Sequence, residues 1–188
     1  MADDISAAKR QLRREMLELR RAITDRPIVG DRTIGVRDRL IEALAERFDG
    51  VPGAAVSREH VVRTELRRVL AYDAVAGEVD LGPLLDALRA SGVEVVVPAA
   101  TPDASVPVLP SWPQVIIVPG VAFDGDGARL GRGGGWYDRL LGDPARQGVA
   151  LGVAFETQVV DSVPTEPHDA VLDAVVTDRA VRWVGNGR

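Results

Sequence analysis

The chain has 188 residues, of which 46% are hydrophobic, and this favours one globular domain with a sizeable core. It contains no cysteine, which excludes disulfides and thiolate metal sites. Its net charge of −5 argues against a general nucleic-acid-binding protein, because such proteins are usually basic. No apolar run is long enough to span a membrane, and the acidic start at Asp3 and Asp4 is unlike a signal peptide. We therefore expect a cytoplasmic protein without a membrane or nucleic-acid partner.

The first part of the chain predicts two helices. Apolar residues recur at three- and four-residue spacing over residues 5–23, which is typical of an amphipathic helix. Lys9 and Arg13 lie four residues apart on one side of it, and Arg20 also flanks its apolar stripe. Lys9 is the only lysine of the chain. Either its position favours a compact ammonium over a planar guanidinium, or a single lysine has remained there by chance. The alternative to a functional role is that Lys9 and Arg13 belong to an ordinary solvent-exposed helix face. After a break, residues 33–48 predict the second helix.

Strands and helices alternate along the rest of the chain. The sequence pattern predicts strands at 69–72, 93–97, 115–118, 149–155, 171–176 and 180–184. It predicts helices at 81–90 and from Trp136 onward. This alternation predicts an α/β fold: a single domain over residues 1–188 with a mostly parallel central sheet flanked by helices. Residues 99–113 hold four prolines and can form at most a short edge strand. Residues 58–67 are ambiguous, and His60 has no partner there at metal-ligand spacing.

A glycine-rich stretch follows the apolar run that ends at Val118. It reads VPGVAFDGDGARLGRGGGWYDRLL and interleaves glycines with Arg129 and Arg132. A strand, a glycine loop and a helix start are the parts from which α/β proteins build phosphate sites, because backbone N–H groups and arginines then face the anion. Neither the P-loop pattern nor a complete G-x-G-x-x-G is present. A surface hairpin or an RNA-contacting patch is the alternative interpretation.

This stretch carries a family resemblance. Its pattern PG-x-AFD-x-x-G-x-RLGRG-x-G-x-YDR-x-L resembles the motif of the 5-formyltetrahydrofolate cyclo-ligases, also called methenyltetrahydrofolate synthetases. Residues 8–13 resemble the family's N-terminal K-x-x-x-R element, residues 72–80 its Y-x-x-x-x-x-E-V-D segment, and residues 152–169 its C-terminal block. The resemblance implies an enzyme that uses ATP to phosphorylate the formyl oxygen of 5-formyltetrahydrofolate. N10 of the folate then displaces phosphate and closes the ring of 5,10-methenyltetrahydrofolate.

The resemblance also implies roles for individual residues. Those it assigns to ATP binding are Lys9, Arg13, Arg129, Leu130, Gly131, Arg132, Gly133, Gly134, Gly135, Trp136 and Tyr137, with Arg132 and Lys9 acting in catalysis. Those it assigns to the folate are Glu78, Tyr72, Trp136 and Tyr137. Asp138 and Asp169 would hold Mg²⁺, whose preference for carboxylate oxygens they satisfy. For Asp138, a helix cap beside Arg139 is the alternative.

The chain also departs from the family pattern. The segment between Pro98 and Val115 is shorter than usual, and no Gly-x-x-Glu-Pro turn accompanies Trp112. Asp73 and Trp136 replace residues that are commonly apolar and commonly Tyr or Phe, respectively. The ATP side is therefore expected to be complete and the pterin side reduced. We expect reduced folate and ATP as partners of a monomer or weak dimer. The alternatives are a related ATP-dependent enzyme acting on another small amide or acid, and a non-catalytic nucleotide- or RNA-binding protein.

Overall fold

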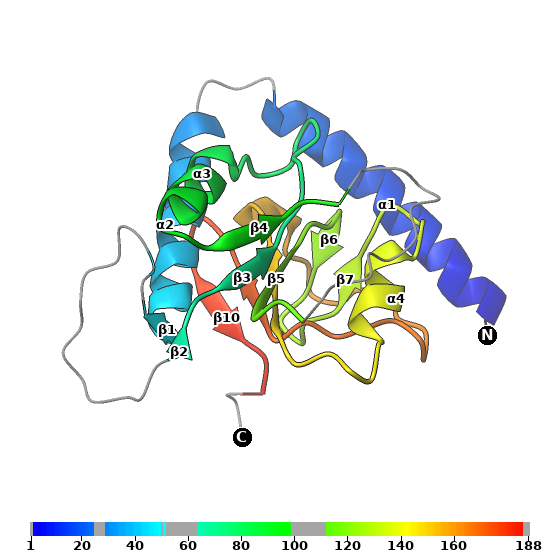
Figure 1. The fold of residues 1–188 in the computed structure, drawn as a ribbon. Coiled ribbons are helices and arrows are strands. Elements are labelled where there is room, and N and C mark those ends of the chain that lie inside the picture. The colour runs from blue at the N-terminus through cyan, green and yellow to red at the C-terminus, as the bar shows by residue number, and fades with distance from the viewer. Residues whose placement is uncertain (1, 25–28, 50, 52–63, 99–111, 186–188) are drawn as a thin grey trace.

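A six-stranded sheet forms the centre of the computed structural model, which describes residues 2–24, 29–49, 51, 64–98 and 112–185. In the order of the sheet, its strands are β10 (Val181–Trp183), β9 (Ala174–Val176), β8 (Val149–Val153), β5 (Val115–Val118), β3 (Arg68–Leu70) and β4 (Glu94–Val96). All neighbouring pairs are parallel except β10 with β9 (Figure 1). The predicted α/β fold with a mostly parallel sheet is confirmed. Within these residues no helix is both long and apolar enough to cross a membrane.

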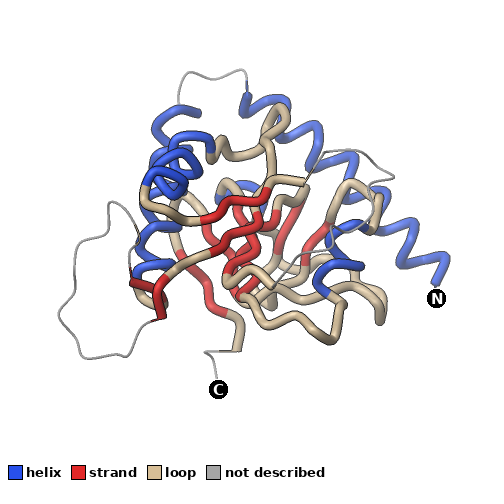
Figure 2. The backbone as a smooth tube through the Cα atoms, viewed as in Figure 1, coloured by secondary structure: helices blue, strands red, loops and turns tan. Residues whose placement is uncertain are grey.

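The central strand β5 shows why the sheet lies in the middle of the molecule. Its four side chains are fully buried, Val115 and Ile117 in one apolar cluster and Ile116 and Val118 in another. Side chains alternate between the two faces of a strand, so a continuous apolar run needs cover on both faces. The fold meets this need with three layers, since the helices lie outside the strands (Figure 2).

One face of the sheet is covered by α2 (Val29–Ala45) and α3 (Gly82–Ala90). The prediction of a second helix over residues 33–48 was wrong at both ends, because α2 begins and ends earlier. Phe48 continues the helical spacing of Leu44, but its backbone pairs instead with Thr64. That pairing forms a two-stranded parallel ladder of β1 (Phe48–Asp49) and β2 (Thr64–Glu65). A tertiary contact therefore ends the helix where local spacing would extend it.

The other face carries the elements that position the site. These are α1 (Ala2–Thr24), the antiparallel hairpin of β6 (Ala122–Phe123) and β7 (Arg129–Leu130), and α4 (Trp136–Leu141). The predicted N-terminal helix is confirmed, and α1 runs beside the hairpin (Figure 1). Its Met16 and Leu12 pack against apolar residues of the hairpin. The turn of the hairpin is tied by the Asp124 carboxylate, which accepts hydrogen bonds from the backbone N–H groups of Ala128 at 2.9 Å and Val163 at 2.8 Å. This packing brings the start of the chain beside the glycine-rich loop.

Two expectations fall outside the described residues. One is the short bridge, of which residues 99–111 are not described, and the other is His60. Trp112, at the end of that bridge, packs half-buried against the apolar cluster that contains Val118.

Candidate functional site

A cavity of about 400 Å³ lies where four separate segments meet. They are the first half of α1, the loop that carries Glu78, the stretch 119–138 and the stretch 166–169. With the exception of Tyr72, every residue assigned to the site from the sequence lines this cavity. Pro119 and Gly120 follow the carboxyl end of β5, and Glu78 follows that of β3, which is the sheet edge where open parallel sheets bind ligands.

Tyr72 is placed elsewhere. Its hydroxyl donates to the backbone oxygen of Val79 at 3.0 Å inside the core, and its side chain lines a second cavity of about 230 Å³ beside Asp73 and Asp80. Burial raises the pKa of Tyr72 well above its ordinary value. The structure therefore does not bring Tyr72 to the main cavity, although Glu78, from the same sequence motif, does line it.

The glycine loop has a defined path. Gly133 has a φ of +105° and Gly135 a φ of +63°, conformations that residues with a Cβ rarely adopt. Arg13 of α1 donates from Nε to the Gly131 oxygen at 2.9 Å, and Arg139 of α4 donates to the Gly134 oxygen at 3.0 Å. Because arginines from two helices hold its carbonyl oxygens, the loop is built into the wall of the cavity.

Lys9 lies between two carboxylates from the far end of the chain. Its Nζ is 2.7 Å from Glu166 Oε2 and 2.5 Å from Asp169 Oδ2, and its side chain is 13% exposed. The backbone N–H of Glu166 also donates to Asp169 Oδ2, at 2.6 Å. Partial burial works against both charges, but these hydrogen bonds outweigh it, so the pKa of Lys9 is raised and that of Asp169 is lowered. Both groups are charged at neutral pH.

The two carboxylates predicted to hold a metal have different surroundings. Asp169 belongs to a group with Glu166 and His168 whose possible ligand atoms lie within 4.8 Å of one another. Hard carboxylate oxygens fit Mg²⁺, although Lys9 already neutralises them and would have to turn to another anion when the ion binds. Asp138 instead accepts from Arg129 Nη2 at 2.8 Å. The helix-cap alternative for Asp138 was wrong, because the N-cap of α4 is Gly135 and no side chain caps it.

Arg129 forms part of the inner wall. Its side chain is only 4% exposed, and its guanidinium lies over the Tyr137 ring at 5.5 Å as well as against Asp138. Trp136 meets Tyr137 edge to face, with ring centroids 4.7 Å apart. Burial raises the pKa of Tyr137, which stays protonated at neutral pH. Arg129 therefore holds the start of α4 in place.

Sequence reasoning missed the partner of Glu78. Glu78 Oε1 lies 3.6 Å from Arg20 Nη2 and 3.5 Å from Arg132 Nε. Burial lowers the pKa of Arg20 and Glu78 opposes this; a guanidinium stays charged at neutral pH all the same. The available signal was helical spacing, since steps of four and seven residues separate Lys9, Arg13 and Arg20 and put them on one face of α1. Sequence reasoning also assigned no role to Glu166, which lies within the C-terminal block of residues 152–169.

Comparisons with known proteins find similar sequences and similar structures. Residues 109–178 match the model of the 5-formyltetrahydrofolate cyclo-ligase family. The 5-formyltetrahydrofolate cyclo-ligase of Mycolicibacterium smegmatis is 29% identical to this chain and covers 92% of it and 94% of its own length. The enzyme of that name from Escherichia coli K12 is 45% identical over 36% of this chain and 38% of its own length. The predicted resemblance to the 5-formyltetrahydrofolate cyclo-ligases is confirmed.

Two solved structures share the fold of this chain. A 5,10-methenyltetrahydrofolate synthetase from Aquifex aeolicus superposes with a TM-score of 0.65 at 27% identity, over 96% of this chain and 94% of its own. One from Mycoplasma pneumoniae shares the fold, with a TM-score of 0.70 at 23% identity, over 90% of this chain and 98% of its own. The family match includes the glycine loop, Asp138 and Asp169, whereas Lys9, Arg13 and Glu78 lie outside it. The tertiary packing of the chain places all of them at one cavity.

Proposed function

We propose that the protein converts 5-formyltetrahydrofolate to 5,10-methenyltetrahydrofolate, using Mg-ATP and releasing ADP and phosphate. The observation that carries this proposal is the single cavity in which the glycine loop meets the lone lysine and Glu78. The names of the relatives support the reaction class. The arrangement of charges supports the use of a triphosphate.

The nucleotide side of the cavity is rich in cations. Its lysine and arginine residues are Lys9, Arg10, Arg13, Arg129 and Arg132. Phosphoryl transfer depends mainly on positioning and on neutralising oxygen charge, both of which a glycine loop with arginines supplies. Arg132 is the cation suited to reach a phosphate, because its side chain is 55% exposed at the cavity. Arg13 and Arg129 hold the loop and α4 in place around it.

The proposed reaction has two steps, a phosphoryl transfer and a ring closure. The formyl oxygen attacks the γ-phosphorus, and the bond from that phosphorus to the ADP oxygen breaks. The N10 lone pair then attacks the activated formyl carbon, the carbon–oxygen bond breaks, and phosphate leaves while N10 loses its proton. When bound, Mg²⁺ would neutralise phosphate oxygens, and the carboxylates suited to hold it are Asp138, Glu166 and Asp169. In this proposal, Lys9 leaves Asp169 when the nucleotide binds and contacts a phosphate oxygen instead.

The folate side is built from Glu78 and two aromatic rings. The Glu78 carboxylate can accept hydrogen bonds from the amino-pyrimidine edge, and Trp136 and Tyr137 offer surface for stacking. The shortness of the 99–113 bridge in the sequence supports the further proposal that folate binding is weakened. It predicts a high KM for 5-formyltetrahydrofolate with methenyl product still formed.

Gly134→Ala tests the nucleotide half. A Cβ at Gly134 would meet no atom within 4 Å, and its φ is not positive, so the change should not disturb folding. Because the added methyl group would occupy the phosphate side of the cavity, we expect ATP affinity to fall about tenfold or more in calorimetric titrations. Gly125→Ala is the matched control: it too has open space and a non-positive φ, but it lies in the exposed hairpin turn.

Turnover of the wild-type protein with 5-formyltetrahydrofolate and Mg-ATP tests the whole reaction. Methenyl product and phosphate in equal amounts are expected. If Gly134→Ala binds ATP as the wild type does, the loop is not a phosphate site. If another small amide or acid stimulates ATP hydrolysis and no methenyl product forms, the related enzyme with a different substrate is favoured. If no substrate stimulates hydrolysis, the protein is a binder without catalysis.

A further inference from the structure

We propose that Arg20 is a positioning residue for folate recognition. It would hold the Glu78 carboxylate against the cavity wall, while Arg132, which contacts the same carboxylate oxygen, serves the nucleotide. This inference rests on the proposed function, which gives Glu78 its substrate. It adds a buried residue of α1 that does not itself line the cavity.

Arg20 is packed against the whole turn that carries Glu78. Its side chain is 3% exposed, and Nη2 donates to the Ala76 oxygen at 3.1 Å as well as lying 3.6 Å from Glu78 Oε1. A Cβ at Gly77 would come within 3.0 Å of Arg20 Nε, so the turn rests directly on the guanidinium. A buried guanidinium that loses its carboxylate leaves an uncompensated charge, so the contact holds both partners in place.

The carboxylate is held from its other side as well. Glu78 Oε2 accepts from the Val75 backbone N–H at 3.2 Å, and the Glu78 N–H donates to the Val75 oxygen at 2.9 Å. The side chain is 10% exposed. Oε1 is therefore the oxygen shared between the two arginines, and its position is set by the turn and Arg20 together.

The two arginines on Oε1 differ in one decisive respect. Arg20 is buried near the carboxyl end of α1, whereas Arg132 is 55% exposed on the glycine loop. Water or a ligand can replace an exposed partner at little cost, but not a buried one. A substrate N–H that binds Glu78 would thus displace Arg132 and leave Arg20 in place. The displaced Arg132 would then be available to the phosphates.

The same helix therefore serves both halves of the site. Lys9 and Arg13 face the nucleotide side, and Arg20 lies seven residues beyond Arg13, roughly 10 Å farther along the helix axis. The docking of α1 through Met16 fixes both ends relative to the hairpin.

Two matched substitutions separate the roles. Arg20→Met and Arg132→Met each remove one guanidinium from the same carboxylate oxygen of the full-length protein. We expect Arg20→Met to raise the KM for 5-formyltetrahydrofolate about tenfold or more while the KM for ATP stays within about twofold, and Arg132→Met to do the reverse. In a Glu78→Gln background, Arg20→Met should add less than about twofold, because its effect passes through Glu78.

Folding is checked by the thermal midpoint of each variant. If Arg20→Met does not fold, Arg20→Lys carries the test, since it keeps the charge but loses the rigid planar guanidinium whose Nη2 contacts both Ala76 and Glu78. The inference is overturned if a folded Arg20 variant leaves the folate KM unchanged, raises both KM values equally, or lowers only kcat. Wild-type protein that forms no methenyl product would refute the proposed function, and the inference with it.

Discussion

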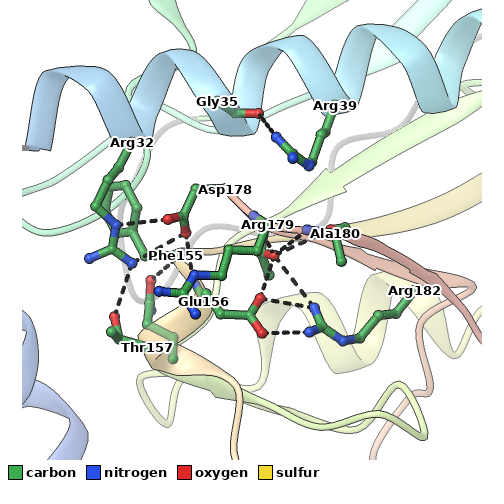
Figure 3. Close-up of polar contacts among 12 residues, drawn as sticks. Arg32, Gly35, Arg39, Phe155, Glu156, Thr157, Asp178, Arg179, Ala180 and Arg182 are labelled. Atoms are coloured by element: carbon green, nitrogen blue, oxygen red, sulfur yellow. Dashed lines mark hydrogen bonds and ion pairs between the residues drawn. The ribbon is translucent and has the colours of Figure 1, made fainter.

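Two clusters of carboxylates and cations stand on different parts of the fold. One lines the cavity and includes Lys9, Glu78 and Asp169. The other joins α2 to the segments around β9 and β10, as Figure 3 shows, and none of its ion-paired residues lines that cavity. Its carboxylates are Glu156 and Asp178, and we call it the α2 cluster.

In the α2 cluster every carboxylate oxygen accepts at least one hydrogen bond. Asp178 accepts from Arg32 Nε at 2.9 Å and Nη2 at 3.2 Å, and from the backbone N–H of Glu156 at 2.7 Å. Glu156 takes two donors from Arg182, at 2.5 and 3.0 Å, and the Thr177 hydroxyl at 2.6 Å. Arg32 also lies over the Phe155 ring at 5.0 Å. Every bond in this set joins elements of the fold (Figure 3).

The cavity cluster leaves acceptor capacity unused. Glu78 Oε1 has two cations at 3.5 and 3.6 Å, which is too long for strong hydrogen bonds. Asp169 receives both Lys9 and the Glu166 N–H on Oδ2. An ion pair by itself therefore does not mark a binding site. We propose that carboxylates and cations with unused hydrogen-bonding capacity beside a cavity are the feature that distinguishes the candidate site.

The largest effect that would test this contrast is expected for Lys9→Arg. The Lys9 ammonium lies within 2.7 Å of two carboxylates, and its side chain is largely buried, so a planar guanidinium does not fit without moving its neighbours. We expect kcat/KM for ATP to fall about 10- to 100-fold, the range for a lost charge-assisted hydrogen bond. Arg14→Lys, an exposed change on the same helix, is the control. Normal turnover of Lys9→Arg at limiting ATP would place Lys9 with the structural ion pairs.

The α2 cluster predicts a loss of stability without a loss of catalysis. Asp178→Asn removes the negative charge that accepts hydrogen bonds from two nitrogens of Arg32. We therefore expect the free energy of unfolding in urea to fall by about 1–3 kcal/mol. Both KM values should remain those of the wild type. Asp86→Asn breaks an exposed pair with Arg89 and should cost under about 1 kcal/mol. A changed ATP KM in Asp178→Asn would mean that the two clusters are coupled.

The smallest effect is expected in acid. Burial opposes the charges of Glu156 and Asp178, but the hydrogen bonds from Arg182 and Arg32 outweigh it, and both carboxyl pKa values are lowered. A carboxyl whose pKa is lower in the folded protein stabilises it above the unfolded-state pKa of about 4, and this contribution is lost as the pH falls further. Urea unfolding from pH 7 to pH 3 should therefore show wild type and Asp178→Asn converging at low pH. A constant difference across that range would exclude the charge of Asp178 as its cause.

Much of the fold follows from local pattern. The four-residue apolar run of β5 predicts a strand buried on both faces, and the three- and four-residue spacing in α1 predicts its buried stripe around Met16. The glycine loop with Arg132 indicates an anion site by residue type alone. The family motif then connects this loop with Lys9 and Glu78. These features depend on neighbours within about two helical turns or on a continuous motif, so sequence reasoning reaches them.

Only the tertiary structure decided which distant segments contact one another. The docking of α1 on the hairpin puts Lys9 against residues 157 and 160 positions away, and Arg20 against the turn before Glu78. It also shows that Tyr72 is a core residue and that Phe48 pairs in a ladder instead of extending a helix. Local periodicity predicts which face of an element is buried but not which partner covers it. That choice depends on how whole surfaces pack, and it determines which charges become the site.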